Sequence, residues 1–591
     1  MNRAALTDRR LRPGVAVTPL RAGLHLRGRR GTLTLEGGGA LPALWRLLAE
    51  PLREGRVAQL LDSMAAGATL RASVDTLLGQ LDAHGLLVAG PSPAAPGGPV
   101  ADWTGASAGR PEVAAAALAR FRAEVVAAAP DGPLAAAAGR ALAAGGLPLD
   151  RTADPELPAD RVLLRLHGAG PERCVAVGHL GGNGYATAPG SSVQVTADAE
   201  ALETRWGRAH PPQEPGGVEP LPAAFLPLLA GSAAHRLLCA AAGQPDPSRE
   251  GEDERPPPDA TPTTPAAVLP SVLLARARPL RADYRAWPGP LRIDADRRVR
   301  LAPAATLGEA LRRMADLTDE RCGALPEPLP ADLRQLPVPL ARCALPGAGA
   351  GAGGAELLGG AARLDLARLD LFCRAAELAL GEDLFTVGAT PGHARGRALR
   401  SAARRRRAPG RPDPVAAERW ADHPQLRHWW ATLTGRLGVA ARLEVVRLAP
   451  GAEAYRAVVR PLAPGGGSAP PPPLGDAVEA TPGDAAAFAA LGAVVRTRAA
   501  AEGRPGARFF APDGALAPLA AAGVRTADWE DAGGTGRWLA DLAGREEAHQ
   551  GALRRITGRA PRPEAPRVRP ELVALLEAFG FTVLPAPRED R

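Results

Sequence analysis

The strongest constraint on the fold is a change of hydrophobic period within the first ninety residues. Residues 15–18, 23–27 and 31–35 each alternate apolar side chains with polar or small ones, which is typical of strands with one buried face. From Leu41 to Leu81 the apolar residues instead recur every three or four positions, as on one face of a helix. The pattern predicts three antiparallel strands followed by three helices, which is a winged-helix arrangement.

A winged helix can bind DNA or a peptide, and the helix expected over Leu70–Leu81 favours a peptide. A DNA-reading helix needs several Arg, Asn or Gln side chains, whereas Asp75 and Asp82 lie here where phosphates would approach. An extended peptide can instead add to a free edge strand, with its side chains on an apolar helix. We therefore expect a peptide rather than nucleic acid. The expected peptide-binding residues are Thr32, Leu33, Thr34, Leu35, Val74, Leu77, Leu78 and Leu81.

The basic residues of the chain are all arginine. The 71 Lys and Arg residues include no Lys, and the formal net charge is +8 over 591 residues. A Walker-type phosphate loop and Schiff-base chemistry both need a Lys amine, so both are excluded. The five cysteines are scattered and form no C-x-x-C pair, so we expect reduced thiols, no metal site and a cytoplasmic protein.

No segment has the features of a membrane anchor or a signal peptide. Residues 1–14 are rich in Arg and lack an apolar core. The most apolar helix expected, over residues 221–243, is interrupted by Pro227, His235 and Arg236. We therefore expect no membrane partner.

Two stretches rich in Pro, residues 91–111 and 244–265, have the composition of linkers. Strand and helix patterns alternate between them, so the fold class expected is α/β (α+β). We predict a domain over residues 1–90, a linker over 91–111, an α/β domain over 112–295 and a further α+β region over 296–591.

Neither of two candidate nucleotide loops has the context that the chemistry needs. Gly349, Gly351 and Gly354 match G-x-G-x-x-G, but they lie in a run of Ala and Gly without a preceding strand, which indicates a flexible loop. The loop before the helix at residues 134–144 contains Pro130 and Pro133, which remove backbone donors. We expect no bound cofactor.

Other polar groups have ordinary structural interpretations. His423 and His428 are five residues apart, which does not place both on one helix face for a metal. Cys373 followed by Glu377 indicates a buried thiol beside a surface acid rather than a nucleophile and its base. We therefore expect no catalytic residue.

Two further polar segments also have structural interpretations. His179 to Tyr185 favours a hairpin turn over a pocket. The run Arg404–Arg407 favours a solvated loop or a contact with an acidic peptide over nucleic acid.

The N-terminal residues resemble the RiPP recognition element, a winged-helix domain. The segments that carry the resemblance are Gly14–Val17, Leu24–Arg27 and Thr32–Leu35, followed by the helix rich in Leu and Trp. The family binds leader peptides between its third strand and third helix, which would here be Gly31–Leu35 and Leu70–Leu81. The resemblance therefore implies binding of a precursor leader peptide.

The middle region is similar to the degenerate adenylating domain of ocin-ThiF-like proteins, which act in thiopeptide and related thiazole/oxazole pathways (TOMM biosynthesis). The likeness lies in residues 123–129, 225–242 and 275–282. The chain lacks the nucleotide glycines, the Lys and the zinc cysteines of active ThiF-type enzymes. We therefore expect no adenylation.

The last region is similar to YcaO folds. Helices expected over residues 364–380 and 484–500 lie where that family carries acids for magnesium and ATP. On the first helix only Asp370 and Glu377 share a face, and the second helix has only Asp484. A remnant or docking domain is therefore expected, and Pro585–Pro587 resembles the proline-rich end of cyclodehydratases.

The resemblances together imply a leader-peptide-binding scaffold without catalysis of its own. It would deliver a ribosomal precursor peptide to a partner YcaO cyclodehydratase for azoline formation. Two alternatives remain: a divergent ATP-dependent YcaO enzyme that acts alone through residues 300–591, and a winged-helix transcription factor.

Overall fold

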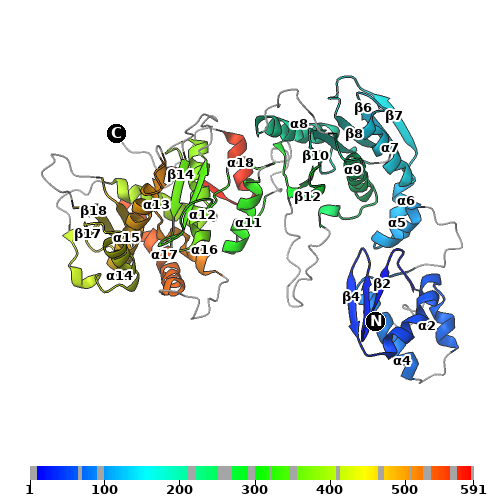
Figure 1. Ribbon diagram of the computed structural model, residues 1–591, viewed down its shortest axis with the longest axis horizontal. Coiled ribbons are helices and arrows are strands. Elements are labelled where there is room, and N and C mark those ends of the chain that lie inside the picture. The colour runs from blue at the N-terminus through cyan, green and yellow to red at the C-terminus, as the bar shows by residue number, and fades with distance from the viewer. Residues whose placement is uncertain are drawn as a thin grey trace. The chain divides into compact units, whose positions relative to one another are not determined.

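The computed structural model describes residues 9–586 apart from 64–68, 90–98, 169, 210–219, 250–268, 291–299, 320, 345–355, 382, 407–412, 463–471, 505–506, 523–533 and 559–568. The chain forms two compact units (Figure 1). Unit 1 consists of residues 1–261 and 271–285, and unit 2 consists of residues 262–270 and 286–591. Both units combine helices with β-sheets, which confirms the predicted α/β class.

The N-terminal part of unit 1, residues 9–89, has the three strands and three helices that the change of period predicts. Its elements in chain order are β1 (Arg9–Leu11), β2 (Ala16–Leu20), β3 (Gly23–Arg27), β4 (Thr32–Glu36), α2 (Ala40–Glu54), α3 (Val57–Asp62), α4 (Thr69–Ala83) and β5 (Leu87–Ala89). Strands β2, β3 and β4 form an antiparallel sheet in that order, and β1 pairs with β5.

One compact apolar core holds these elements together. Trp45, Leu48 and Leu52 recur on one face of α2 and are buried, and Gly55 ends the helix in the left-handed conformation at φ 68°. Leu33 of β4 joins the same core. The sheet therefore has one buried face and one exposed face.

The rest of unit 1 is an α/β domain. Its elements are α5 (Pro99–Ser107), α6 (Pro111–Leu118), β6 (Phe121–Ala127), α7 (Pro133–Ala144), β7 (Leu149–Ala153), β8 (Arg161–Gly168), β9 (Arg173–Leu180), β10 (Asn183–Ala186), α8 (Ser192–Ala209), α9 (Phe225–Ala241), η1 (Pro247–Arg249), β11 (Ser271–Arg276) and β12 (Arg281–Ala286). Helix α5 lies within the segment that composition favours as a linker.

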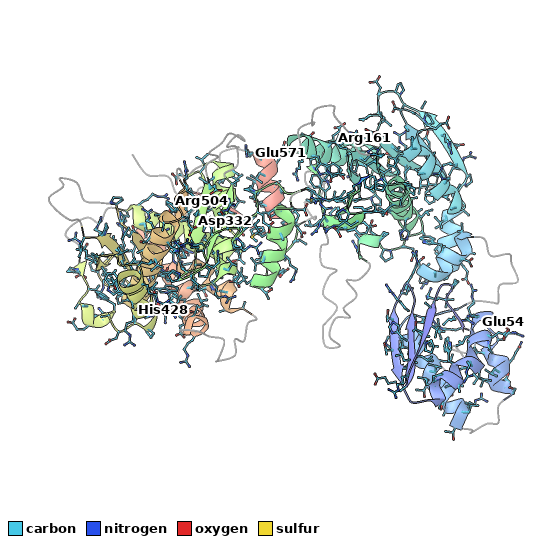
Figure 2. All side chains as sticks on the ribbon, in the orientation of Figure 1. Glu54, Arg161, Asp332, His428, Arg504 and Glu571 are labelled. Carbon is cyan, nitrogen blue, oxygen red and sulfur yellow. The ribbon has the colours of Figure 1, made fainter. Side chains whose placement is uncertain are left out.

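These strands form a seven-stranded sheet in the order β12-β11-β10-β9-β8-β6-β7. Only β6 and β7 are shown to be parallel, and α7 connects them. The predicted turn near Gly182 is confirmed, because β9 and β10 form an antiparallel hairpin there. Arg161 of β8 is buried (Figure 2) and donates to Glu203, which also accepts from the hydroxyl of Tyr185 at 2.6 Å.

Unit 2 contains eight helices with α labels, three short helical turns and nine strands within the described ranges. They are α11 (Leu307–Leu317), β13 (Leu340–Ala344), β14 (Glu356–Gly360), α12 (Leu364–Leu380), β15 (Phe385–Gly388), α13 (Pro391–Arg405), β16 (Asp413–Pro414), η2 (Ala417–Arg419), α14 (Pro424–Ala431), η3 (Thr432–Arg436), β17 (Ala441–Arg447), β18 (Tyr455–Pro461), β19 (Gly475–Glu479), α15 (Pro482–Ala500), β20 (Arg508–Phe510), η4 (Gly514–Leu516), α16 (Ala517–Ala521), α17 (Thr535–Thr557), α18 (Pro570–Ala578) and β21 (Thr582–Pro585).

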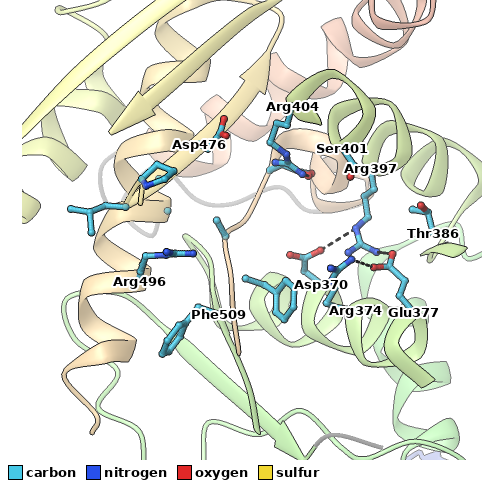
Figure 3. Close-up of a pocket in the computed structure, with 17 residues that line it drawn as sticks. Asp370, Arg374, Glu377, Thr386, Arg397, Ser401, Arg404, Asp476, Arg496 and Phe509 are labelled. Atoms are coloured by element: carbon cyan, nitrogen blue, oxygen red, sulfur yellow. Dashed lines mark hydrogen bonds and ion pairs between the residues drawn. The ribbon is translucent and has the colours of Figure 1, made fainter. Parts of the chain in front are cut away.

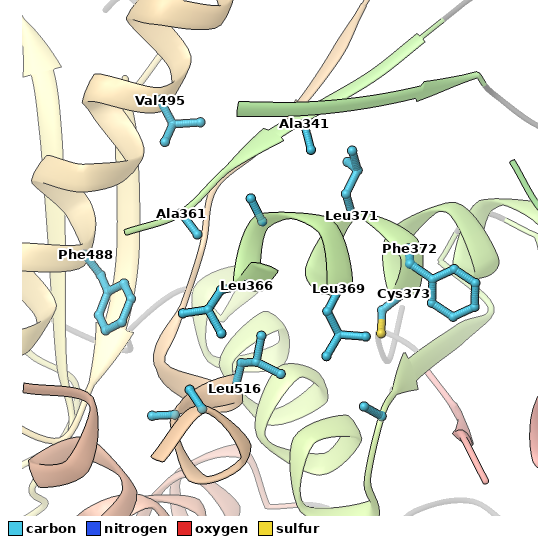
Figure 4. Close-up of a cluster of buried hydrophobic side chains, with 14 of the residues drawn as sticks. Ala341, Ala361, Leu366, Leu369, Leu371, Phe372, Cys373, Phe488, Val495 and Leu516 are labelled. Atoms are coloured by element: carbon cyan, nitrogen blue, oxygen red, sulfur yellow. The ribbon is translucent and has the colours of Figure 1, made fainter. Parts of the chain in front are cut away.

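Helix α12 and helix α15 are central to unit 2. Buried side chains of α12, among them Leu369 and Phe372, pack in one core with Phe488 and Val495 of α15 (Figure 4). Strand β19 crosses α15 so closely that a Cβ on Gly475 would lie 1.9 Å from a backbone oxygen of α15. The small residues of α15 permit this approach and explain why nearly all of the helix is buried.

No helix in the part of the chain that the structure describes is both long enough and apolar enough to cross a bilayer.

Candidate functional site

The first candidate site is the outer edge of β4. This strand pairs with β3 on one side, and no other described strand pairs with it on the other side. Thr32, Thr34 and Glu36 are exposed, whereas Leu33 is buried in the core. The edge is therefore a row of backbone groups supported from behind by an apolar face.

The hydrogen-bond pattern shows which backbone groups face outward. The N–H of Gly28 donates to the carbonyl of Gly31, and the N–H of Gly37 donates to that of Ala22, so these two pairs fix the alternation at both ends of the β3–β4 ladder. In an antiparallel ladder every second residue directs its N–H and C=O away from the partner strand. Those residues in β4 are Thr32, Thr34 and Glu36.

The helix residues predicted to bind a peptide lie behind this edge rather than open to solvent. Val74, Leu77, Leu78 and Leu81 of α4 are at most 4% exposed and belong to the same core as Leu33. They support the sheet from within. The exposed positions of α4 are others, including Leu70, Ala72, Ser73 and Thr76.

The second candidate site is a cavity of about 380 Å³ in unit 2. It lies among α12, α13, β19, α15 and the segment that follows β20 (Figure 3). Its charged lining residues are Asp370, Arg374, Glu377, Arg397, Arg404, Asp476, Arg496 and Asp513. Sequence reasoning identified Asp370 and Glu377 as sharing a face, and both line this cavity.

Arginine side chains hold both of these acids. Glu377 accepts from Arg374 at 2.6 Å and from Arg397 at 2.7 Å, and it also accepts from the backbone N–H of Val387 at 2.9 Å. Arg397 also lies 3.4 Å from Asp370. A metal ion at these carboxylates would have to compete with guanidinium groups already in place.

Burial raises the pKa of Asp370 to about 6, because the opposing effect of Arg397 is offset by the nearby acids Asp513 and Glu377. For Asp513 burial alone would raise the pKa, but Arg400 and Arg404 together lower it below its usual value. Asp370 is therefore the first of the two acids to take up a proton as the pH falls.

A fully buried ion cluster lies behind the cavity. Arg400 of α13 donates to Glu479 of β19 at 3.0 and 2.6 Å and to Glu546 of α17 at 2.7 Å through each of two nitrogens. The N–H of Gly514 also donates to Glu479 at 2.8 Å. This cluster ties three elements together, and burial raises the pKa of Glu479 to about 7 although Arg400 opposes the shift.

Several sequence-based interpretations need correction. Glu377 is not a surface acid: it is 2% exposed, because the arginines around it replace its hydration. Arg404 is not in a solvated loop, since α13 continues to Arg405. The prediction that Cys373 is buried is confirmed, and burial raises the pKa of its thiol to about 12.

The structure also shows where the two histidines considered as metal ligands lie. His423 precedes α14 and caps its N-terminus by accepting from the N–H of Leu426, and His428 lies within α14. His423 also lies 3.4 Å from Asp484, which accepts from the indole of Trp538 at 2.9 Å. No group of three or more potential metal ligands occurs among the residues described. The glycine motif at residues 349–354 lies outside them.

Sequence reasoning missed the arginines as site residues. Arg397, Arg400 and Arg404 lie three and four positions apart, so they share a face of α13. This spacing of three and four residues could have indicated that the three arginines pair with acidic side chains of other elements. It was hidden because these residues belong to an arginine-rich segment that was interpreted as one basic run.

No protein-family model and no curated protein matches the chain. Two solved structures are similar to it over most of its length. One is described as "Heterocyclase in complex with substrate and Cofactor", with a TM-score of 0.43 and 13% sequence identity over 83% of this chain and 82% of that one. The other is the structure of the heterocyclase TruD, with a TM-score of 0.41 and 12% identity over 91% of each chain.

Proposed function

We propose that the chain binds the leader segment of a ribosomally made precursor peptide and presents that peptide to a separate YcaO cyclodehydratase for azoline formation. The observation that carries the proposal is the outer edge of β4, which lacks a partner strand among the described residues. The sequence resemblance to RiPP recognition elements supplies the class of ligand.

The geometry of β4 suits addition of an extended strand. The outward-directed groups of Thr32, Thr34 and Glu36 are spaced by two residues, as the backbone of an added strand requires. The side chains of Leu33 and Leu35 pack in or against the core of the N-terminal part and so anchor the strand. Main-chain pairing would therefore supply affinity without rearrangement of the sheet.

The exposed surface of α4 fits a peptide better than DNA. Leu70, Ala72, Ser73 and Thr76 are uncharged, so they offer no cations to phosphates. Asp82, near the end of the helix, pairs with Arg9 at 2.6 Å. An apolar and small-residue helix surface can accept side chains of an extended ligand.

The proposed role of the chain is delivery rather than chemistry. The carboxylates that line the cavity of unit 2 are held by arginines, which supports a scaffold over a magnesium-dependent enzyme. A bound leader raises the effective concentration of the rest of the peptide at a partner's active site.

The test is a substitution that removes one outward-facing donor without touching the core. Thr34→Pro deletes the N–H at the centre of the β4 edge, where proline is tolerated because that group does not pair within the sheet. Thr34→Val is the matched control, because both variants lose the side-chain hydrogen bond with His25 and only one loses the N–H.

Fluorescently labelled leader peptides, encoded by short reading frames beside the gene, are titrated into the full chain. We expect saturable binding at micromolar concentration to the unsubstituted chain and to Thr34→Val. Thr34→Pro should weaken it about fivefold or more, since a hydrogen bond contributes about 0.5–1.5 kcal/mol and the added strand also loses register. Equal affinity of the two folded variants would contradict strand addition.

The alternative enzyme has a separate readout. ATP hydrolysis by the chain alone, dependent on a precursor peptide, would favour a cyclodehydratase over a scaffold. In that case the activity should be lost in Glu377→Gln while the folded state is retained.

A further inference from the structure

We infer that the outer edge of β4 selects its peptide by the order of two charges. It takes a basic side chain beside Glu36 and an acidic side chain four residues further along the peptide, within reach of Arg27. This inference rests on the proposed function, because it concerns the peptide that adds to β4. The backbone groups of β4 pair alike with any extended peptide, so discrimination between peptides must come from side chains.

The outer edge of β2 is a poorer acceptor than that of β4. The two strands are the outer strands of the N-terminal sheet (Figure 1). Leu24 and Leu26 of β3 direct their backbone groups to β4, so alternation leaves Val17 and Pro19 of β2 directed outward. Pro19 has no N–H, which removes a donor from the middle of that edge. The charges that matter to an added strand are therefore those along β4.

Opposite charges stand at the two ends of the β4 edge. Glu36 is the last residue of β4, and Arg27 of β3 stands directly opposite Thr32, the first residue of β4. All three residues are exposed, and residues directly opposite each other point to the same face of a sheet, here the face away from the core. The edge thus carries a negative charge at its Glu36 end and a positive charge at its Thr32 end.

Neither charge is compensated by the residue opposite it in the sheet. Arg27 stands between Ala16 of β2 and Thr32 of β4, and Glu36 stands opposite Gly23. Each of these neighbours is uncharged. An added peptide can therefore supply the opposite charge at both ends without breaking a cross-strand ion pair.

Arg27 is the arginine best placed to contact the peptide at the Thr32 end. Of the two arginines in the turn that joins β3 to β4, Arg29 lies 3.4 Å from His235, and Arg30 donates to the carbonyl of Ser107 at 3.3 Å. Both are thus directed at other elements of unit 1. The side chain of Arg27 lies on the exposed face of the sheet instead.

The ladder of β4 fixes where the side chains of an added strand would lie. Thr32, Thr34 and Glu36 direct their backbone groups outward, so each would face one residue of that strand. The peptide residues opposite Glu36 and Thr32 are therefore four positions apart, roughly 14 Å, and both point to the exposed face. Arg27 lies two strands from the second of them, about 10 Å, which extended arginine and acidic side chains span together across the short side chain of Thr32.

The direction of the added strand sets the order of the charges. The pairings of β2 with β3 and of β3 with β4 are both antiparallel. A peptide that continues this pattern runs from the Glu36 end toward the Thr32 end, so its basic residue comes first and its acidic residue four positions later. The reverse order would place like charges together at both ends.

Fluorescence anisotropy of the full chain tests the inference with labelled leader peptides encoded by short reading frames beside the gene. Each leader that binds is also synthesised with its two charges exchanged, so that the acidic residue comes first. We expect a leader that binds to carry a basic residue four positions before an acidic one. Its exchanged version should bind the unsubstituted chain about fivefold or more weakly at low salt, and added salt should reduce the difference.

The variant is Arg27→Glu with Glu36→Arg, which reverses two exposed charges and keeps the backbone groups of β4. It should prefer the exchanged leader about fivefold or more, because its charges are then matched again. The control Arg46→Glu with Glu50→Arg makes the same change on exposed residues of α2, whose buried side chains pack in the core behind the sheet. It should keep the preference for the native leader, and circular dichroism checks that both variants fold.

Four results would overturn the inference. They are a bound leader without this charge order, equal affinity of the unsubstituted chain for the two versions, its tighter binding of the exchanged version, and an unchanged preference in the folded charge variant.

The proposed function can fail or stand separately. Thr34→Pro should weaken both versions of the leader alike, since main-chain pairing does not depend on charge. If Thr34→Pro does so and the charge variant keeps the native preference, strand addition stands and charge selection fails. Absence of binding by every leader would overturn both proposals.

Discussion

Replacement of Arg400 by methionine should destabilise unit 2 by about 3–5 kcal/mol at pH 8, the usual cost of removing one partner from a buried ion pair. Arg400 has no exposed surface, and its three nitrogens make four hydrogen bonds of 2.6–3.0 Å to Glu479 and Glu546. Methionine fills similar space but donates nothing. Two carboxylates would then be buried without a cation, and the melting temperature should fall by about 6 °C or more.

The loss of stability in Arg400→Met should increase with pH, because the buried acids of the cluster can take up protons at low pH. Burial raises the pKa of Glu479 to about 7 even with Arg400 present, against a usual value of 4.5. Without Arg400 the folded-state pKa of Glu479 must rise further, while its unfolded-state value stays near 4.5. Proton binding therefore stabilises the folded variant fully below about pH 4.5, and this contribution is lost as the pH rises through the folded-state pKa. The defect of the variant should be small at pH 5 and large at pH 8.

Urea unfolding at both pH values measures the loss, and hydrogen exchange of peptides from α13 and α17 assigns it to unit 2. The matched control is Arg405→Met on the same helix, because Arg405 is partly exposed and pairs with Asp383 at 3.6 Å. The control should change stability by about 0.5 kcal/mol or less. A loss below about 1 kcal/mol in Arg400→Met at pH 8, or an equal loss at pH 5, would refute the reasoning.

Two further predictions concern buried groups in each unit. Burial alone would raise the pKa of Asp484, but hydrogen bonds with His423, Thr481 and Trp538 lower it to about 2. Asp484→Asn should therefore lower the free energy of unfolding by about 2 kcal/mol at pH 7. Urea unfolding should show that this difference in stability becomes smaller as the pH falls below 4. Leu78→Ala should destabilise the N-terminal part of unit 1 by about 2–5 kcal/mol, because Leu78 fills its core. The affinity of the folded variant for leader peptide should change less than that of Thr34→Pro, and a larger effect of Leu78→Ala would show that α4 forms the binding pocket itself.

The local elements of this protein could be predicted from sequence because they follow from local pattern. Helix α12 was predicted over Leu364–Leu380 and has those bounds, since its apolar residues recur with the helical period. Helix α15 was predicted from Asp484 and begins two residues earlier, at Pro482, which is a favoured first residue of a helix. The sharing of one face by Asp370 and Glu377 followed from the same periodicity.

The sequence by itself determined the change from strands to helices at the N-terminus, the burial of Cys373 and the lack of any lysine chemistry. Only the tertiary structure decided which charges meet. Arg400 pairs with Glu479 and Glu546, which are 79 and 146 residues away along the chain, and no local pattern encodes such partners. Hydrophobic periodicity and helix capping act within one element. Burial of a charge is tolerated only where folding brings an opposite charge to it. The arginine-lined cavity therefore forms only when α12, α13, β19 and α15 pack together.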